Sequence, residues 1–339
     1  MRGAVLIAAL IALAGAARAN DTQAVLRAGG LTFEKSAAVR IEREDLTIAP
    51  GDISVRYRFR NLTAAPVTAL IAFPLPELDM GDLSETPHTF HFNGRDGDVV
   101  DFRLWVNGKP AAAALEARAV NAKGADITAT LRALHIPLVG ARSDHESLDA
   151  LAALKPPAVR RLVAAGGAYP DEWTGSDTIK HPKWKVRAAY HWRQTFPPGA
   201  TVTIEHRYRP VMGEVLFDSF ADVTADNALG ALGEWPDEHR SWCATPTQVG
   251  AFGAGKAGRA KVQWVEYVLK TGANWAGPIG AFHLSIAPGA RARAFTCPIP
   301  GLQLHRDGPG LSADRVGFTP TSDIAVMFLS PGGPVPRMH

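Results

Sequence analysis

Glu266 is the acidic residue best placed to do chemistry. Residues 262–270 alternate with a period of two, which predicts a strand with Glu266 on the face of Val262 and Trp264. A carboxyl group buried on such an apolar face has a raised pKa, as a general acid or a ligand-binding acid requires. We favour the structural alternative, in which Glu266 pairs with an arginine on a neighbouring strand or lies on an exposed edge.

The loop that follows this strand, residues 274–280, carries an amide and a large aromatic ring at Asn274 and Trp275. Such a pair can hydrogen-bond to a sugar or a peptide and stack on it. The interpretation that we favour is that Trp275 plugs the end of a β-sandwich while the glycines turn the chain. Glu266, Asn274 and Trp275 are the candidate ligand-binding residues, and no residue is predicted to be catalytic.

The chain has two cysteines, Cys243 and Cys297. In an exported protein an even pair predicts a disulfide, which here would close a loop of about 54 residues and contribute roughly 4 kcal/mol in the chain-entropy picture. A catalytic thiol is the alternative, but neither cysteine has a local signature for one.

His88 and His91 could bind a metal together with the nearby acids Asp79, Asp82 and Glu85. Their i, i+3 spacing on a strand would point the two rings to opposite faces, so we predict no metal site.

The acidic turn at residues 93–101 resembles a calcium-binding loop but lacks the spacing of an EF-hand; we favour a polar hairpin and leave calcium open. The sequence has no G-x-S-x-G, H-E-x-x-H or phosphate-binding glycine loop, and no cofactor is predicted. The absence of these motifs does not exclude hydrolysis by a pair of carboxylates.

These residues sit in a chain that begins with an export signal. Arg2 is followed by the apolar run 4–14 and by a small-x-small site at 17–19, which predicts cleavage before Asn20. The run is too short to span a bilayer, which needs about 20 residues, and no later segment reaches that length. An uncleaved membrane anchor is the alternative. We expect a periplasmic or secreted protein with no transmembrane segment in its mature part.

The mature chain is nearly neutral. Removing residues 1–19 takes two of the 36 basic residues and none of the 33 acidic ones, so the basic count falls to 36 − 2 = 34. This balance gives no electrostatic case for nucleic acid as a partner. The hydrophobic fraction of 46% is that of a globular protein.

Short strands separated by turns predict a mainly β fold, an antiparallel β-sandwich. Residues 53–60 and 201–208 alternate between apolar and polar side chains. The phrase VRYRFRNL at 55–62 resembles VTIEHRYRPV at 202–211, which leaves open an organisation in two related sandwich halves. Residues 115–168 lose the alternation and show helical spacing. The predicted organisation is a signal peptide at 1–19, a β-sandwich region at 20–114, a helical insertion at 115–168 and a β-rich region at 169–339.

Several phrases together resemble one protein family. They are NDTQAVLRAGGL at 20–31, EDL at 44–46, FPLPE at 73–77, FPPGATVTIEHRYRPVMG at 196–213 and VEYVLKTGANWAGPIGAFHL at 265–284. The chain resembles the exported bacterial proteins grouped as domain of unknown function 4424. The resemblance implies an exported, mostly β protein without an established activity, so it supplies no catalytic residues.

We expect a non-catalytic binding or interaction module of the cell envelope, whose partner is an envelope protein or a glycan. The alternative is a hydrolase of envelope polysaccharide or peptide, with Glu266 as its acid.

Overall fold

The computed structural model describes residues 22–27, 30–85, 87–168, 181–223 and 242–332. The predicted signal peptide and its cleavage site lie outside these residues. The side chain of Glu85 also lies outside what is described. Among the described residues, no helix is both long enough and apolar enough to cross a membrane.

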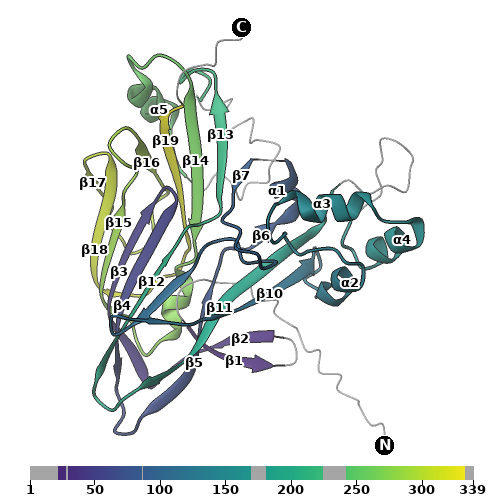
Figure 1. Cartoon of the computed structure of the whole chain (residues 1–339). Coiled ribbons are helices and arrows are strands. Elements are labelled where there is room, and N and C mark those ends of the chain that lie inside the picture. The colour runs from purple at the N-terminus through teal and green to yellow at the C-terminus, as the bar shows by residue number, and fades with distance from the viewer. Residues whose placement is uncertain (1–21, 28–29, 86, 169–180, 224–241, 333–339) are drawn as a thin grey trace, which may run out of the picture.

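The fold consists of three β-sheets, so the predicted mainly β class is confirmed (Figure 1). Among the described residues, all strand pairs are antiparallel except β3 with β15. Sheet I has the order β10 (Ala114–Asn121), β11 (Trp184–Phe196), β5 (Val67–Pro74), β1 (Thr22–Arg27) and β2 (Gly30–Glu34), with β6 (Leu78–Asp79) also paired to β11. Sheet II has the order β17 (His305–Asp307), β18 (Gly310–Phe318), β15 (Ile279–Ile286), β3 (Val39–Ala49), β4 (Asp52–Asn61), β12 (Thr201–Tyr208), β8 (Arg103–Val106) and β9 (Lys109–Ala111). Sheet III has the order β16 (Arg293–Phe295), β19 (Ile324–Pro331), β14 (Ala260–Tyr267), β13 (Met212–Phe217) and β7 (His88–Thr89).

Sheet II forms one layer of the core, and sheets I and III both pack against it. Phe73 of sheet I lies 4.9 Å from the ring of His206 in sheet II and 6.4 Å from that of Tyr267 in sheet III, centroid to centroid. The hydroxyl groups of Tyr57 in sheet II and Tyr267 in sheet III are 3.4 Å apart. One continuous hydrophobic cluster therefore joins the three sheets.

The alternating phrases form the strands that were predicted. In β4 the side chains at 53, 55, 57 and 59 are buried, while the arginines at 56, 58 and 60 are exposed. Strand β12 buries Ile204 and Tyr208 in the same way. The two strands pair directly, with Ile204 opposite Tyr57. The two similar phrases are thus neighbours in one sheet, not equivalent strands of two sandwich halves.

The segment predicted to be a helical insertion begins with a strand. Residues 115–120 belong to β10, which pairs along its length with β11 and forms an edge of sheet I. Pairing with β11 outweighs the missing alternation, because the strand makes its backbone hydrogen bonds whatever its side-chain pattern. The helices follow between β10 and β11 and project from one side of sheet I (Figure 1). They are α2 (Thr128–Ala133), α3 (His145–Ala152) and α4 (Pro156–Ala164).

Two further helices and a 3-10 turn complete the described structure. Helix α1 (Met80–Glu85) follows β6, and α5 (Pro246–Gly253) precedes β14. The 3-10 turn η2 (Lys270–Asn274) follows β14. A second, smaller hydrophobic cluster joins Val249 of α5 to Val262 and Met327 of sheet III, on the opposite face of that sheet from Tyr267.

Candidate ligand-binding groove

A groove of about 760 Å³ lies where sheets I and III approach each other. This volume is within the usual range for small-ligand sites. One wall comes from sheet III and the other from β6 and β11 of sheet I, while Tyr208 at the end of β12 contributes from sheet II. The groove therefore depends on all three sheets.

The wall from sheet III carries an aromatic platform made by Trp264, His88 and Trp242. Gly213 of β13 lies opposite His88 of β7 on one side and opposite Trp264 of β14 on the other. The ring centroids of Trp264 and His88 are 5.9 Å apart, and those of Trp264 and Trp242 are 5.5 Å apart. All three residues are among those that line the groove. Trp242 is buried, whereas Trp264 stays partly exposed.

The position of the Trp264 ring depends on a glycine. A Cβ atom built on Gly213 would lie 2.0 Å from both Cε2 and Cζ2 of Trp264, a distance that real Cβ atoms do not show. The indole thus occupies the space of the missing side chain. A glycine inside a strand is typical of such a close approach.

Glu266 also lines the groove, next to this platform. It lies on the face of β14 that carries Trp264, as the alternation predicts, and its side chain is exposed, which agrees with the exposed-edge alternative of the sequence analysis and not with a buried acid. The physical reason is that β13 pairs with β14 only as far as Trp264, so the cover of this face ends before Glu266. The residue opposite Glu266 on β19 is Ala325.

The wall from sheet I carries charged side chains that form ion pairs with one another. Glu77 accepts a hydrogen bond of 2.6 Å from Nε of Arg187. Nζ of Lys185 lies 3.5 Å from both Glu77 and Asp79. Partial burial opposes the charge on Lys185, but the two carboxylates outweigh it and raise the pKa of its ammonium group.

Tyr208 lines the groove with an almost completely buried side chain, which is 2% exposed. Its hydroxyl group is buried and has no hydrogen-bond partner among the described residues. Burial raises the pKa of this phenol, so it stays protonated and can donate a hydrogen bond. A buried hydroxyl without a partner is costly, and a polar ligand atom or a water would relieve that cost.

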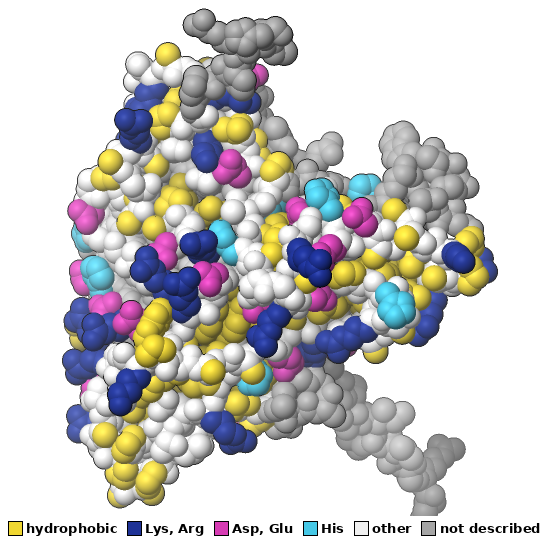
Figure 2. Space-filling model, in the orientation of Figure 1, with side chains coloured by type: hydrophobic (Ala, Val, Ile, Leu, Met, Phe, Trp, Pro, Cys, Tyr) yellow, Lys and Arg dark blue, Asp and Glu magenta, His cyan; other side chains and the backbone are white. Residues whose placement is uncertain are grey.

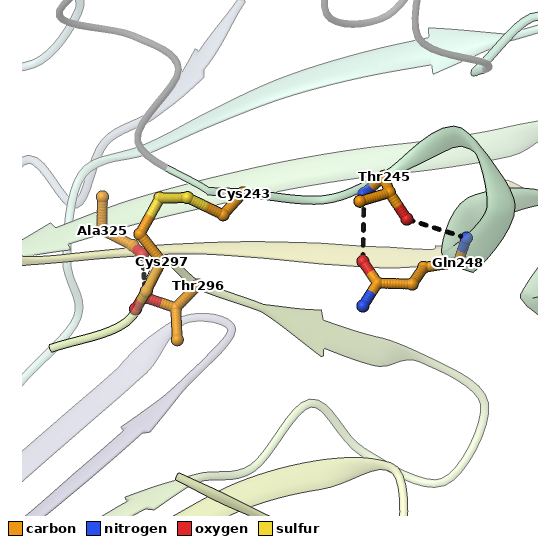
Figure 3. The surroundings of a disulfide bond; sticks show 6 residues. All are labelled: Cys243, Thr245, Gln248, Thr296, Cys297 and Ala325. Atoms are coloured by element: carbon orange, nitrogen blue, oxygen red, sulfur yellow. Dashed lines mark hydrogen bonds between the residues drawn. A yellow bond between two sulfur atoms is a disulfide. The ribbon is translucent and has the colours of Figure 1, made fainter. Parts of the chain in front are cut away.

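The predicted disulfide between Cys243 and Cys297 is present, with an S–S distance of 2.02 Å (Figure 3). Cys297 lines the groove, and Trp242 immediately precedes Cys243. The neighbouring Thr296 donates a hydrogen bond of 2.7 Å to the backbone carbonyl of Ala325. The disulfide therefore ties the segment that carries Trp242 to sheet III.

Asn274 and Trp275 do not line the groove. Trp275 is 4% exposed and packs 4.7 Å from Phe59, centroid to centroid, which is the plugging arrangement that the sequence analysis favours. Nδ2 of Asn274 donates to Oγ1 of Thr22 at 3.1 Å, and its backbone carbonyl accepts from Ser36 at 2.7 Å. Glu266 is thus separated from the two residues with which it was grouped.

The residues considered as metal ligands have other environments. His88 belongs to the aromatic platform, whereas His91 forms a bridge with Val100, and burial lowers the pKa of its imidazole. No group of three or more potential metal ligands occurs in the part of the chain that the structure describes.

In the acidic turn at residues 93–101, Asp96 accepts hydrogen bonds from three successive backbone N–H groups, residues 138–140. Asp98 accepts a hydrogen bond of 2.5 Å from Tyr190. These acids fasten the turn to the helical insertion and to sheet I.

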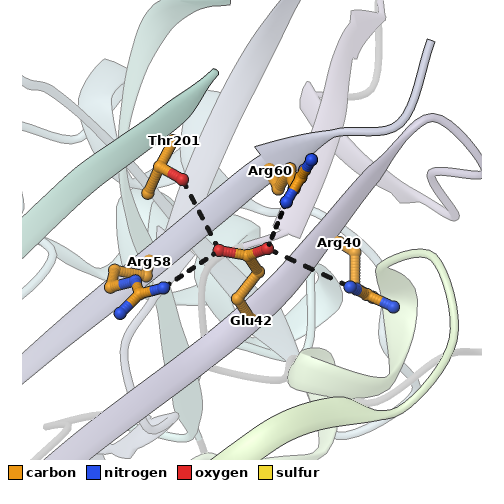
Figure 4. Close-up of polar contacts among 5 residues, drawn as sticks. All are labelled: Arg40, Glu42, Arg58, Arg60 and Thr201. Carbon is orange, nitrogen blue, oxygen red and sulfur yellow. Dashed lines mark hydrogen bonds and ion pairs between the residues drawn. The ribbon is translucent and has the colours of Figure 1, made fainter. Parts of the chain in front are cut away.

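A separate charged cluster lies on the solvent face of sheet II, around Glu42 (Figure 4). Its carboxylate is 3.2 Å from Arg58, 3.4 Å from Arg60 and 4.0 Å from Arg40. Partial desolvation raises the pKa of Glu42, but the hydrogen bonds and charges of Arg58 and Arg60 outweigh it and hold the pKa below its usual value. This carboxylate is a cross-strand link of the sheet.

The sequence analysis missed the platform and Tyr208. Two signals could have found them. Gly213 is a lone glycine next to a strand pattern, which indicates a close approach by another group. Tyr208 continues the buried face of its strand to the last strand residue, two positions before a proline at 210, where the strand leaves the sheet.

Residues 19–327 match the family model described as domain of unknown function (DUF4424). No curated protein matches the sequence. Among solved structures, a Legionella pneumophila protein described as a "putative nutrient binding protein" is 18% identical, with a TM-score of 0.41, and the match covers 87% of this chain and 68% of that one. The M1 zinc metallopeptidase from Deinococcus radiodurans is 10% identical, with a TM-score of 0.29, and the match covers 87% of this chain and 43% of that one. The chain thus spans less than half the length of that peptidase.

Proposed function

Because this chain belongs to the DUF4424 family, whose function is unknown, we propose a function from the groove itself: the protein is an exported, non-catalytic binding module that holds an envelope protein or glycan between sheets I and III. The observation that carries this proposal is a large groove that is lined by a partly exposed tryptophan, Trp264. Apolar walls with a few placed polar groups are typical of binding sites.

The proposal of binding without catalysis is supported by the carboxylates of the groove. Hydrolysis of a glycosidic bond needs two carboxyl groups, one as an acid and one as a base or nucleophile. Glu77 and Asp79 are held in ion pairs with Lys185, and Glu77 also bonds Arg187, which suits a structural role. Glu266 is exposed and lacks the apolar burial that raises the pKa of an acid catalyst.

A substitution that fills the groove with a large side chain tests the proposal. Ala325 lines it beside Glu266, and Ala325→Trp places a large side chain there. Val316 on β18 is 81% exposed and does not line the groove, so Val316→Trp is the matched control. We expect the immobilised mature protein to retain an envelope component, Ala325→Trp to lose it and Val316→Trp to keep it. Equal retention by all three proteins would overturn the proposal, and recovery of the component in cleaved form would favour the hydrolase.

Export is a separate part of the proposal and rests on residues 1–19. Mass spectrometry of protein from the periplasmic fraction or the medium should find Asn20 at the amino terminus. Retention of residues 1–19 on most molecules would contradict cleavage and indicate a membrane anchor.

A further inference from the structure

The aromatic platform includes a partly exposed indole ring, that of Trp264, which lines the groove. The Trp264 ring crosses the space above Gly213, so the backbone of β13 supports it from one side. His88 and the buried Trp242 contact it at 5.9 and 5.5 Å and limit its rotation. A supported, partly exposed indole is a rigid stacking surface that loses little conformational entropy when a ligand binds.

The polar groups around the platform are mainly acceptors. Five carboxylates line the groove: Glu77, Asp79, Asp82, Glu266 and Asp323. These charges disfavour an anionic ligand.

Cationic partners are present for Glu77, Asp79 and Asp323. Lys185 pairs with Glu77 and Asp79, and Nζ of Lys270 lies 2.9 Å from Asp323. A cationic ligand would therefore compete with the protein's own cations. An ionised carboxylate has about four lone-pair sites, so a paired carboxylate can still accept hydrogen bonds from ligand hydroxyl groups.

We propose that the groove binds a neutral saccharide, with one sugar ring stacked on Trp264 and with hydroxyl groups bonded to Glu266 and to the carboxylates of the sheet I wall. A sugar ring has a C–H face that stacks on an indole and hydroxyl groups that both donate and accept. It therefore matches both the apolar platform and the acceptor-rich walls. This inference rests on the proposed binding function and names the ligand class of that same groove.

Isothermal titration calorimetry of the oxidised mature protein tests the inference. The saccharide probes are cellotetraose, maltotetraose and an N-acetylglucosamine tetramer; a galacturonic acid tetramer and a lysine-rich heptapeptide are the anionic and cationic probes. We expect at least one of the first three to bind and the last two not to bind. Two variants are expected to weaken binding. Trp264→Ala removes the indole ring of the platform, and Gly213→Val keeps that ring in the protein but moves it from its place. Trp105→Ala is the control, because Trp105 is a partly exposed tryptophan on β8 outside the groove.

We expect the affinity to fall about tenfold or more in Trp264→Ala and Gly213→Val and to stay unchanged in Trp105→Ala; tenfold corresponds to about 1.4 kcal/mol. Circular dichroism confirms that each variant is folded. Failure of all three saccharides to bind, or binding that survives Trp264→Ala, would overturn the proposal that the ligand is a saccharide. Binding of the heptapeptide or the anionic tetramer that depends on Trp264 would also overturn it, while leaving the groove as a binding site. If Ala325→Trp in addition fails to change the retention of envelope material, the proposed function falls as well.

Discussion

Trp264 and Trp275 belong to neighbouring parts of the chain, yet the fold uses them differently. Trp275 is sealed between the rings of Phe59 and Phe196, and its neighbour Asn274 bonds Thr22 and Ser36. Trp264 is supported from one side by Gly213 and remains partly exposed in the groove. The comparison shows that a tryptophan is structural where other side chains fill the space around it. We propose that it is available for binding where a neighbouring strand ends and the ring stays partly exposed, as at Trp264.

Truncation of each tryptophan should give the largest difference between the two regions. Trp275→Ala leaves a cavity in the core, so we expect the free energy of unfolding to fall by about 3–5 kcal/mol. Trp264→Ala removes a ring that is already partly exposed, and we expect a loss of about 1–2 kcal/mol. Denaturant titration of both variants measures the difference. Equal losses would mean that Trp264 is as structural as Trp275 and would contradict the comparison.

Removal of the disulfide should affect the groove region more than the Trp275 region. Cys243→Ser together with Cys297→Ser releases the segment that carries Trp242, and we expect about 2–4 kcal/mol less stability. The near-ultraviolet circular dichroism of the Trp242–Trp264 pair should weaken in native conditions, because Trp242 is no longer tied to sheet III. An unchanged spectrum in the double variant would show that packing alone holds Trp242 in place.

The carboxylates Glu42 and Glu266 extend the comparison to charged groups. Glu42→Gln leaves the guanidinium groups of Arg58 and Arg60 without their counter-charge, and we expect a loss of about 0.5–1 kcal/mol. Glu266→Gln changes an exposed side chain, and its effect on stability should be within about 0.5 kcal/mol. Thermal unfolding of the two variants measures which substitution causes the larger loss of stability. A larger loss for Glu266→Gln would indicate the ion pair with an arginine that is one of the two structural alternatives in the sequence analysis.

The smallest expected effect is a pH dependence that comes from Glu42. Its pKa is lower in the folded protein than in the unfolded chain, because the bonds from Arg58 and Arg60 outweigh desolvation. The ionised Glu42 therefore stabilises the fold fully above the usual pKa of a glutamate, 4.5. This stabilisation is lost as the pH falls through the lower pKa that Glu42 has in the folded protein. Denaturant midpoints measured from pH 6 down to pH 3 should fall less steeply in Glu42→Gln than in the wild type. Identical slopes would contradict this assignment.

Much of the fold can be predicted from local patterns. Strict alternation in β4 and β12 predicts both strands and the faces that they bury, because a period of two maps directly onto a sheet with one wet face. The pairing of these two strands is not predictable in this way, because their similarity suggests equivalent halves as readily as neighbours. Strand β10 was missed because its pairing with β11, not its own side-chain pattern, makes it a strand.

The candidate site could be predicted only in part. The alternation of residues 262–270 correctly places Glu266 with Trp264, but its exposure depends on where β13 stops pairing with β14. Asn274 and Trp275 were grouped with Glu266 because they are close in sequence, whereas the space around Trp275 is filled by residues far away in the chain. The support of Trp264 by Gly213 is a contact across strands, which a single sequence indicates only through the glycine.

The most direct test of the groove as the binding site follows the tryptophan side chains individually. Mature protein with 15N-labelled tryptophan gives one indole N–H signal per ring, assigned with single Trp→Phe variants. On addition of the saccharide that binds in calorimetry, or of envelope extract, we predict that the Trp264 signal shifts while the Trp275 signal stays in place. A shift of Trp275 without one of Trp264 would contradict the account, because it would place the ligand at the end of the sandwich that Trp275 fills.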